Sequence, residues 1–312
     1  MNTDKSEPIF SMDAGHAVLP HWGVIRAAGD DASPFLHGQI THDVALLPSG
    51  RARYAGYCNA QGRLQANFVL WKQGADIWIA APTEVIEALI KRWRMFVLRA
   101  KCVFEDLSSS HAVTGVWGAA ADGWLGEGDW AVRPHGAHVA IRLPDAEVGA
   151  QRVARALIVG SSAPSFAAAA APAHAWDWLD IHAGLGWVTT ATAGQFVPQM
   201  INMESLDGVS FKKGCYPGQE VVARSQFRGT LKRRGFIAQS AALLAAGQEV
   251  FSSLDATQPC GLVAQAASDG ASHVAVLELQ LSATENSNLH LGAADGPVLS
   301  LLPLPYALRE DI

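Results

Sequence analysis

Residues Gly194 to Arg234 read GQFVPQMINMESLDGVSFKKGCYPGQEVVARSQFRGTLKRR and carry most of the information on fold and function. Cys215 stands between a Lys-Lys-Gly approach and a Tyr-Pro-Gly exit, and Gln219 begins a predicted helix directly after that exit. Nearby cations and a helix N-terminus both stabilise a thiolate. A single cysteine is more often a small core residue, but a Lys-Lys-Gly approach is unusual for a core strand. We therefore predict that Cys215 is a functional thiol supported by Lys213.

A run of five cations without an acidic residue follows the cysteine: Arg224, Arg228, Lys232, Arg233 and Arg234. The first three are spaced by four, so they share a helical face until Gly229 interrupts it. A solvated charged face is the usual explanation of such a run. Beside a candidate thiol, in a chain of net charge −6, it instead favours an anionic ligand or partner.

The rest of the chain predicts an α+β protein with a separate β unit at its C-terminal end. The alternation of Leu64 to Trp71 predicts a strand with one buried face, and Ile77 to Ala80 is its partner across a turn at Gly74. Thr83 is predicted to cap a helix, and the apolar run Met95 to Leu98 completes the α+β unit. After Arg234, short apolar runs separated by Gly, Asp-Gly and Pro predict a small β-barrel or sandwich.

Composition narrows the class of protein. The chain has 312 residues, 49% of them hydrophobic and 17% charged, which is typical of a globular protein of about two domains. Its acidic balance argues against a general nucleic-acid coat. No window is apolar enough to span a membrane and the start lacks signal-peptide features, so we expect a cytoplasmic protein without a membrane partner. The four cysteines form no CxxC pair, and no metal site is predicted.

KKGCYPGQEVVAR, followed by FRG and KRR, closely resembles the signature of the YgfZ proteins, folate-binding relatives of the glycine-cleavage T-protein (GcvT), an aminomethyltransferase. The upstream residues 194–199, followed by Asn202, are similar to a segment that these proteins carry. Two N-terminal stretches also match: FLHGQITHD at 35–43 resembles the family's first motif, and CNAQGR at 58–63 resembles its second hairpin. The resemblance covers nearly the whole chain.

The resemblance implies a GcvT/YgfZ-like ring of three subdomains. Residues 1–228 would form a folate-binding α+β body of two interleaved subdomains, with an Ala/Pro-rich connection near 160–175, and residues 229–312 a small β-barrel. It further implies binding of tetrahydrofolate or a derivative, and support of iron-sulfur cluster assembly or repair in client enzymes, including those that modify tRNA. The signature residues implied in the site are Lys213, Cys215, Tyr216, Gln219, Glu220, Arg224 and Arg228.

Three amides are predicted to contact the folate, because amides match the donor and acceptor edge of a pterin. They are Asn67, Gln199 and Asn202, with Phe196 beside them. Glu220, in the first turn of the predicted helix, suits the helix dipole as well as it suits a ligand, and both interpretations remain open.

Two adjacent positions distinguish an aminomethyltransferase from an accessory protein. The T-protein stretch comparable to the strand from Leu64 carries an Asp-Asp pair, where this chain has Ala66 and Asn67. An amide cannot take up a proton as a carboxylate can, so we interpret the chain as an accessory protein that has lost aminomethyl transfer. Two alternatives remain: a folate-dependent one-carbon transferase that uses Cys215, and a scaffold whose basic run docks a protein partner.

Overall fold

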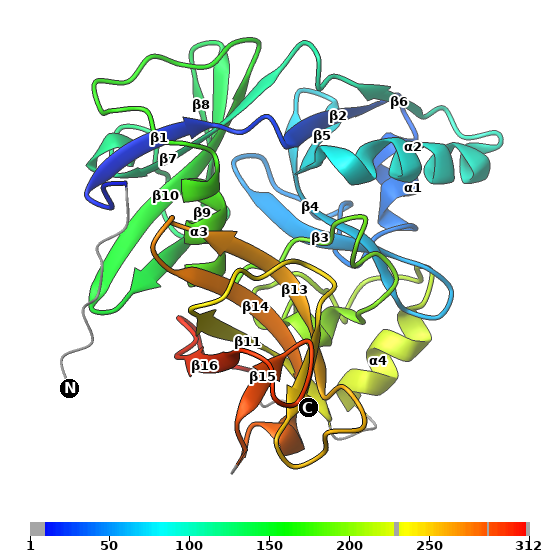
Figure 1. The fold of residues 1–312 in the computed structure, drawn as a ribbon. Coiled ribbons are helices and arrows are strands. Elements are labelled where there is room, and N and C mark those ends of the chain that lie inside the picture. Colours follow the sequence, from blue (N-terminus) through cyan, green and yellow to red (C-terminus); the bar gives the residue numbers. More distant parts are fainter. Residues whose placement is uncertain (1–9, 228–230, 286, 310–312) are drawn as a thin grey trace.

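Three β-sheet units make up the computed structural model, which describes residues 10–227, 231–285 and 287–309 (Figure 1). Two are five-stranded antiparallel sheets and the third is a closed barrel. The chain starts in the first sheet with β1 (Ala14–Val18), builds the second sheet, and then returns to the first. The two sheets are therefore interleaved in sequence.

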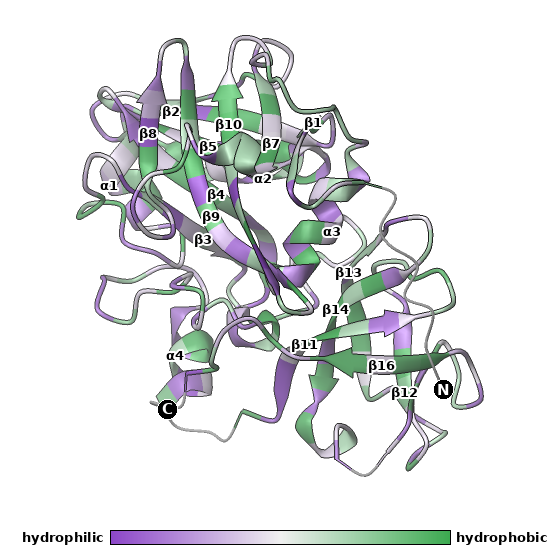
Figure 2. Cartoon of the chain, turned by 90° about the vertical axis from the view of Figure 1, so that its left-hand side faces the viewer, coloured by the Kyte–Doolittle hydropathy of each residue, from purple (hydrophilic) through white to green (hydrophobic). Residues whose placement is uncertain are grey.

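The first sheet has the order β1-β7-β10-β9-β8. Its later strands are β7 (Ala112–Gly118), β8 (Val132–His135), β9 (His138–Val148) and β10 (Gln151–Gly160), with the 3-10 helix η1 (Ala119–Ala121) after β7. Helix α3 (His174–His182) contacts β9 and the barrel. Residues 161–173, which carry the Ala/Pro-rich segment, form a largely exposed connection, as predicted. Figure 2 shows long hydrophobic stretches along β7 and β10.

The second sheet has the order β3-β4-β5-β2-β6. Its strands are β2 (Trp22–Ala28), β3 (Ala52–Cys58), β4 (Leu64–Gln73), β5 (Asp76–Pro82) and β6 (Val103–Asp106). One face packs under α1 (Ala32–His37) and α2 (Thr83–Val97), and the other contributes Val69 and Trp71 to the main core. The predicted β4–β5 hairpin across Gly74 is confirmed.

The start of α2 differs from the sequence expectation, whereas α1 begins at Ala32 with Asp31 as its N-cap residue. Thr83 is not a cap: it is the first helical residue after Pro82, and its hydroxyl donates to the His21 carbonyl oxygen at 3.2 Å. The Met95 to Leu98 run is no separate element, since α2 extends to Val97.

The barrel closes in the order β11-β14-β13-β12-β15-β16. Its strands are β11 (Arg233–Ser240), β12 (Glu249–Ser252), β13 (Gly261–Ser268), β14 (His273–Gln280), β15 (Leu289–Leu291) and β16 (Val298–Leu302), with the 3-10 helix η3 (Leu281–Ala283) after β14. Four of these match apolar runs read from the sequence, whereas β12 and β15 are too short to show a pattern. Their interior residues form a hydrophobic cluster of their own.

Two short helices lie between α3 and the barrel: the 3-10 helix η2 (Pro198–Ile201) and α4 (Gln219–Phe227). The start of α4 at Gln219 is as predicted. The predicted boundary between the body and the barrel, at residues 228 and 229, lies outside the described residues, and β11 begins at Arg233. Within the described residues, no helix is long and apolar enough to cross a membrane.

Candidate functional site

Cys215 lies in a turn directly before α4 and is exposed. The other three cysteines, Cys58, Cys102 and Cys260, are buried, and burial raises the pKa of each thiol. A buried thiol with a raised pKa is a poor nucleophile at neutral pH. The structure thus separates Cys215 from the other cysteines by exposure.

The turn after Cys215 packs closely on the hairpin at residues 59–62. Gly218 has φ +79°, and a Cβ added there would lie 2.4 Å from the Asn59 carbonyl oxygen and 2.5 Å from Gly62 Cα. Gly62 itself has φ +71°. Only glycine combines this backbone conformation with so close an approach. Two motifs far apart in sequence, CNAQGR and KKGCYPGQE, therefore form one structural unit.

Lys213 anchors the turn to the end of α1. Its ammonium donates to the carbonyl oxygens of His37 at 2.5 Å and Ile40 at 2.9 Å, and it lies 4.5 Å from the centre of the Tyr216 ring. Burial lowers the pKa of Lys213 to about 8, an effect that the Asp43 carboxylate opposes. Lys213 is thus a buried cation that holds the turn in place close to the thiol.

His37 is a neighbour of this turn that the sequence did not single out. Its Nε2 lies 3.7 Å from the position of a Cβ added to Gly214, and its Nδ1 lies 3.3 Å from an Asp43 carboxylate oxygen. The contact between Lys213 and His37 spans 176 positions, and no local pattern marks such a pair. The matching FLHGQITHD motif was the available signal, because it contains both His37 and Asp43.

The amides predicted to contact folate have internal partners. Asn67 Nδ2 donates to Tyr54 Oη at 2.6 Å and to the Gly186 carbonyl at 2.7 Å, while Asn67 Oδ1 accepts from the Val188 N–H at 2.7 Å. Asn202 bonds both backbone polar groups of Gly235. These two side chains are buried and join β4 and the barrel to the segments after α3.

Gln199 is also buried and donates to the Val222 carbonyl at 2.9 Å, which ties η2 to α4. Of the Gln199 side-chain polar atoms, Oε1 has no hydrogen-bond partner among the described residues. Phe196 is buried, and Tyr216 is buried beneath Lys213. Neither of the two cavities described below is lined by more than one of these residues, and their contact with a folate stays a prediction.

The basic run is divided among separate ion pairs. Arg224 pairs with Glu220 at 2.6 Å on the exposed face of α4. Gln219, the first residue of α4, is half-buried. Arg233 contacts both Glu278 carboxylate oxygens at 2.6 Å, and buried Arg234 pairs with Glu204. Lys232 is exposed, and Arg228 lies outside the described residues. Arg224 pairs within its own helix, whereas Arg233 and Arg234 find their acids through tertiary contacts.

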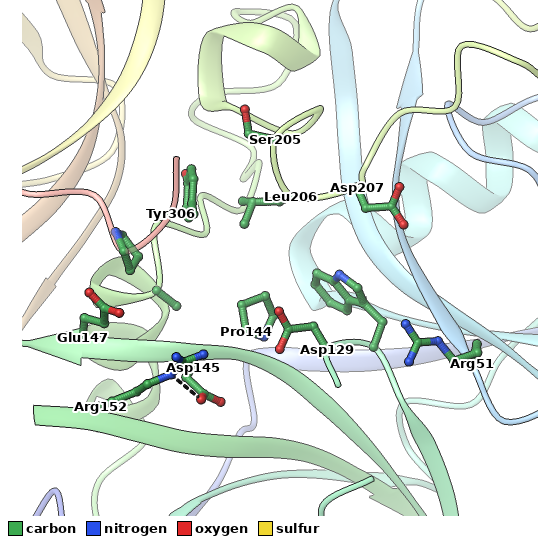
Figure 3. A pocket seen from close by; sticks show the side chains of 13 residues that line it. Arg51, Asp129, Pro144, Asp145, Glu147, Arg152, Ser205, Leu206, Asp207 and Tyr306 are labelled. Carbon is green, nitrogen blue, oxygen red and sulfur yellow. Dashed lines mark hydrogen bonds and ion pairs between the residues drawn. The ribbon is translucent and has the colours of Figure 1, made fainter. Parts of the chain in front are cut away.

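A cavity of about 320 Å³, which we call the central cavity, lies beside the first sheet (Figure 3). Its walls come from the first sheet, from the loop containing Asp207, and from the segment after β16. The lining side chains are Arg51, Asp129, Trp130, Pro144, Asp145, Glu147, Arg152, Ala183, Ser205, Leu206, Asp207, Pro305 and Tyr306. Asp145 is already paired with Arg152 at 2.8 Å.

Backbone strain is concentrated at this cavity. Among the described residues, four other than glycine have positive φ, and two of them line the cavity: Trp130 with φ 64° and Asp207 with φ 58°. The Trp130 ring stacks on Tyr54, with 5.6 Å between centroids and 12° between planes. A bulky residue in this conformation persists only where surrounding packing holds it, and such residues cluster at functional sites.

A second cavity, of about 390 Å³, lies between the body and the barrel. Arg63 and Phe196 line it from the body, and Arg233 and Glu278 line it from the barrel. Phe196 is therefore the one predicted folate contact that borders a described cavity. Cys215 lines neither of the two cavities described here.

Comparisons with known protein sequences identify the family of this chain. No family model matches the chain. The tRNA-modifying protein YgfZ of Yersinia enterocolitica is 30% identical over 309 residues, which cover 94% of this chain and 92% of that protein. The chain belongs to the YgfZ family. The YgfZ protein of Vibrio atlanticus is 29% identical over 304 residues, covering 93% of this chain and 91% of that protein.

The fold of this YgfZ-family chain is shared with a solved enzyme. The crystal structure of the glycine cleavage system aminomethyltransferase T from Bartonella henselae aligns with a TM-score of 0.62 and 16% identity, over 95% of this chain and 86% of that one. The predicted GcvT-like α+β fold with a C-terminal barrel is therefore confirmed. At this identity the likeness establishes the fold and leaves the chemistry to the residues.

Proposed function

We propose that this YgfZ-family chain is a cytoplasmic accessory protein that binds tetrahydrofolate or a derivative and supports iron-sulfur enzymes, including those that modify tRNA. The relatives named tRNA-modifying protein support the tRNA link, and the fold shared with an aminomethyltransferase supports a folate ligand. The observation that carries the ligand proposal is the central cavity, with Trp130 held in a strained conformation at its wall.

The residues at the cavity fit the chemistry of a folate. A pterin ring presents N–H donors, and the exposed carboxylates of Asp129 and Glu147 are acceptors at the cavity wall. The glutamate end of a folate is anionic, and Arg51 offers a guanidinium on the same lining. The volume is within the range of small-molecule sites. When bound, a reduced folate supplies nitrogen atoms that carry one-carbon units.

Calorimetric titration with tetrahydrofolate, and with folic acid as the oxidised comparison, tests the ligand proposal. We expect saturable binding of the reduced form that weakens in Asp129→Asn and Arg51→Met, two changes in cavity-lining side chains. Asp122→Asn, an exposed change away from the lining, is the matched control. No saturable binding at millimolar tetrahydrofolate would contradict the proposal.

Cys215 is the candidate functional thiol because it alone among the four cysteines is exposed. We expect Cys215→Ala to fold and to bind folate, since its side chain packs in no core cluster and lines neither cavity. In a strain lacking the native protein, this variant should fail to restore the activity of iron-sulfur tRNA-modifying enzymes. Full restoration of enzyme activity by Cys215→Ala would show that the thiol is dispensable. Folded Cys102→Ala is the control, and we expect it to restore activity.

The transferase alternative rests on Cys215 replacing a carboxylate. In the described structure Ala66 and Asn67 are buried and Cys215 lies outside the central cavity, so no observation favours this alternative. Turnover of a lipoyl-bound aminomethyl donor at a rate near that of an authentic T-protein would establish it. The scaffold alternative predicts instead that no folate binds and that a partner binds in a salt-dependent manner.

A further inference from the structure

The end of α2 and the segment that follows expose four large apolar side chains. Met95 is 59% exposed, Phe96 44%, Leu98 88% and Val103 59%. They lie within nine positions of one another, at the helix end and the first residue of the edge strand β6. In Figure 1, α2 lies at the outer side of the second sheet, away from the barrel. We call Met95, Phe96, Leu98 and Val103 the apolar tip.

Five exposed cations lie close to the apolar tip in the sequence: Lys91, Arg92, Arg94, Arg99 and Lys101. Residues 88–104 contain no acidic residue, although the whole chain has a net charge of −6. Two acids that flank this stretch have cationic partners: Asp30 lies 3.6 Å from Lys101, and Glu105 pairs with Arg26 at 3.2 Å. Local positive charge is therefore concentrated where apolar side chains face solvent.

Leu98 adds an independent observation. Its φ is 44° and its ψ is −96°, a conformation that is costly for a branched side chain. An exposed leucine recovers little of that cost through packing in the isolated protein. Residues held in such conformations cluster at functional sites, which makes Leu98 a candidate functional position.

We propose that the apolar tip and its five cations dock on an anionic lipid surface, in contrast to the sequence-based expectation of no membrane partner. Membrane-surface segments combine cations for the headgroups with Phe, Leu or Met side chains that enter the interfacial region. A nucleic acid would satisfy the cations and leave Leu98 exposed. No residue of the tip lines either of the two described cavities. The contact is interfacial and reversible, because one short apolar tip anchors weakly.

Sedimentation with vesicles tests this proposal directly. The probes are vesicles of phosphatidylcholine mixed with phosphatidylglycerol, and vesicles of phosphatidylcholine alone. We expect binding to the anionic vesicles only, with a steep loss as salt rises, because exposed charges are screened beyond about 8 Å at physiological salt and about 3 Å at 1 M.

Two variants separate apolar insertion from simple charge attraction. Leu98→Glu should lower vesicle partitioning about tenfold or more, since it removes one inserted side chain and adds a repelled charge. Leu98→Gly should also lower vesicle partitioning. Its unfolding temperature should stay the same or rise, because glycine accepts positive φ. Leu254→Glu, at a leucine 65% exposed on the barrel, is the matched control and should bind as the native protein does.

Three results would overturn the proposal: no binding to anionic vesicles, equal binding by Leu98→Glu and the native protein, or binding of unmodified tRNA that displaces vesicles and is unaffected by Leu98→Glu. The last would assign the cations to a nucleic acid. Folate titration of Leu98→Glu should match that of the native protein, because the apolar tip is separate from the central cavity.

Discussion

The Lys213 ammonium lies 2.5 Å from the carbonyl oxygen of His37, although the two residues are 176 positions apart. This contact joins the end of α1 to the turn that presents Cys215, and a second bond from the same ammonium to the Ile40 carbonyl completes the anchor. Hydrogen bonds from a charged donor are stronger than hydrogen bonds between neutral groups.

Lys213→Met should lower the free energy of unfolding by about 1–3 kcal/mol, because both carbonyls lose their donor in a buried setting. It should also slow alkylation of Cys215 at neutral pH by removing the buried cation near the thiol. Urea denaturation and iodoacetamide kinetics measure the two effects. Lys212→Met, at the exposed neighbouring lysine, should change neither unfolding nor alkylation by a comparable amount. Equal behaviour of the two variants would argue against the anchoring role.

Arg234→Ala should cost about 3–5 kcal/mol of stability, because it leaves the buried Glu204 carboxylate without its partner. Arg224→Ala should cost less than about 1 kcal/mol, since the Arg224–Glu220 pair is exposed on α4. Chemical denaturation of both variants provides the comparison. Similar losses would show that the basic run acts as one surface and not as separate ion pairs.

Asn67→Asp, which restores a carboxylate in the comparable T-protein position, should destabilise the fold and create no transferase activity. The Nδ2 atom that donates to Tyr54 and Gly186 would become an oxygen facing the Gly186 carbonyl. Loss of a buried donor costs about 1–3 kcal/mol. Thermal unfolding and an aminomethyl-transfer assay check the two parts, and a stable variant with turnover would refute both.

His182 should make the protein less stable as the pH falls from about 6.5 to about 4. Burial lowers the pKa of His182 to about 4, from an ordinary value of 6.5, although the Glu147 carbonyl and Asp269 act in the opposite direction. Between these values the unfolded chain binds a proton that the folded chain does not, so acidification favours unfolding by up to about 3 kcal/mol.

The difference in unfolding free energy between native protein and His182→Gln, measured across that pH range, isolates this contribution from other titrating groups. His174→Gln, at an exposed histidine of the same helix, should reproduce the native profile. A native profile in His182→Gln would locate the acid sensitivity elsewhere.

Local patterns in the sequence were sufficient for the hairpin of β4 and β5, for the start of α4 and for four barrel strands, because periodicity and turn residues act within a few positions. They failed at β12 and β15, which are only 4 and 3 residues long. Helix α3 also escaped notice: it follows the Ala/Pro-rich segment and is buried nearly all round, so it shows no polar face.

By itself the sequence determined the family, the α+β class with its barrel, and the choice of Cys215 among four cysteines, since motif spacing and flanking residues are local properties. Only the tertiary structure decided the partners of polar groups. It gave Asn67 and Asn202 internal hydrogen bonds, paired Arg234 with Glu204, and set Lys213 on the end of α1. These partners lie 30 to 176 positions apart, and a buried polar group takes whichever partner the packing of distant elements brings within about 3 Å.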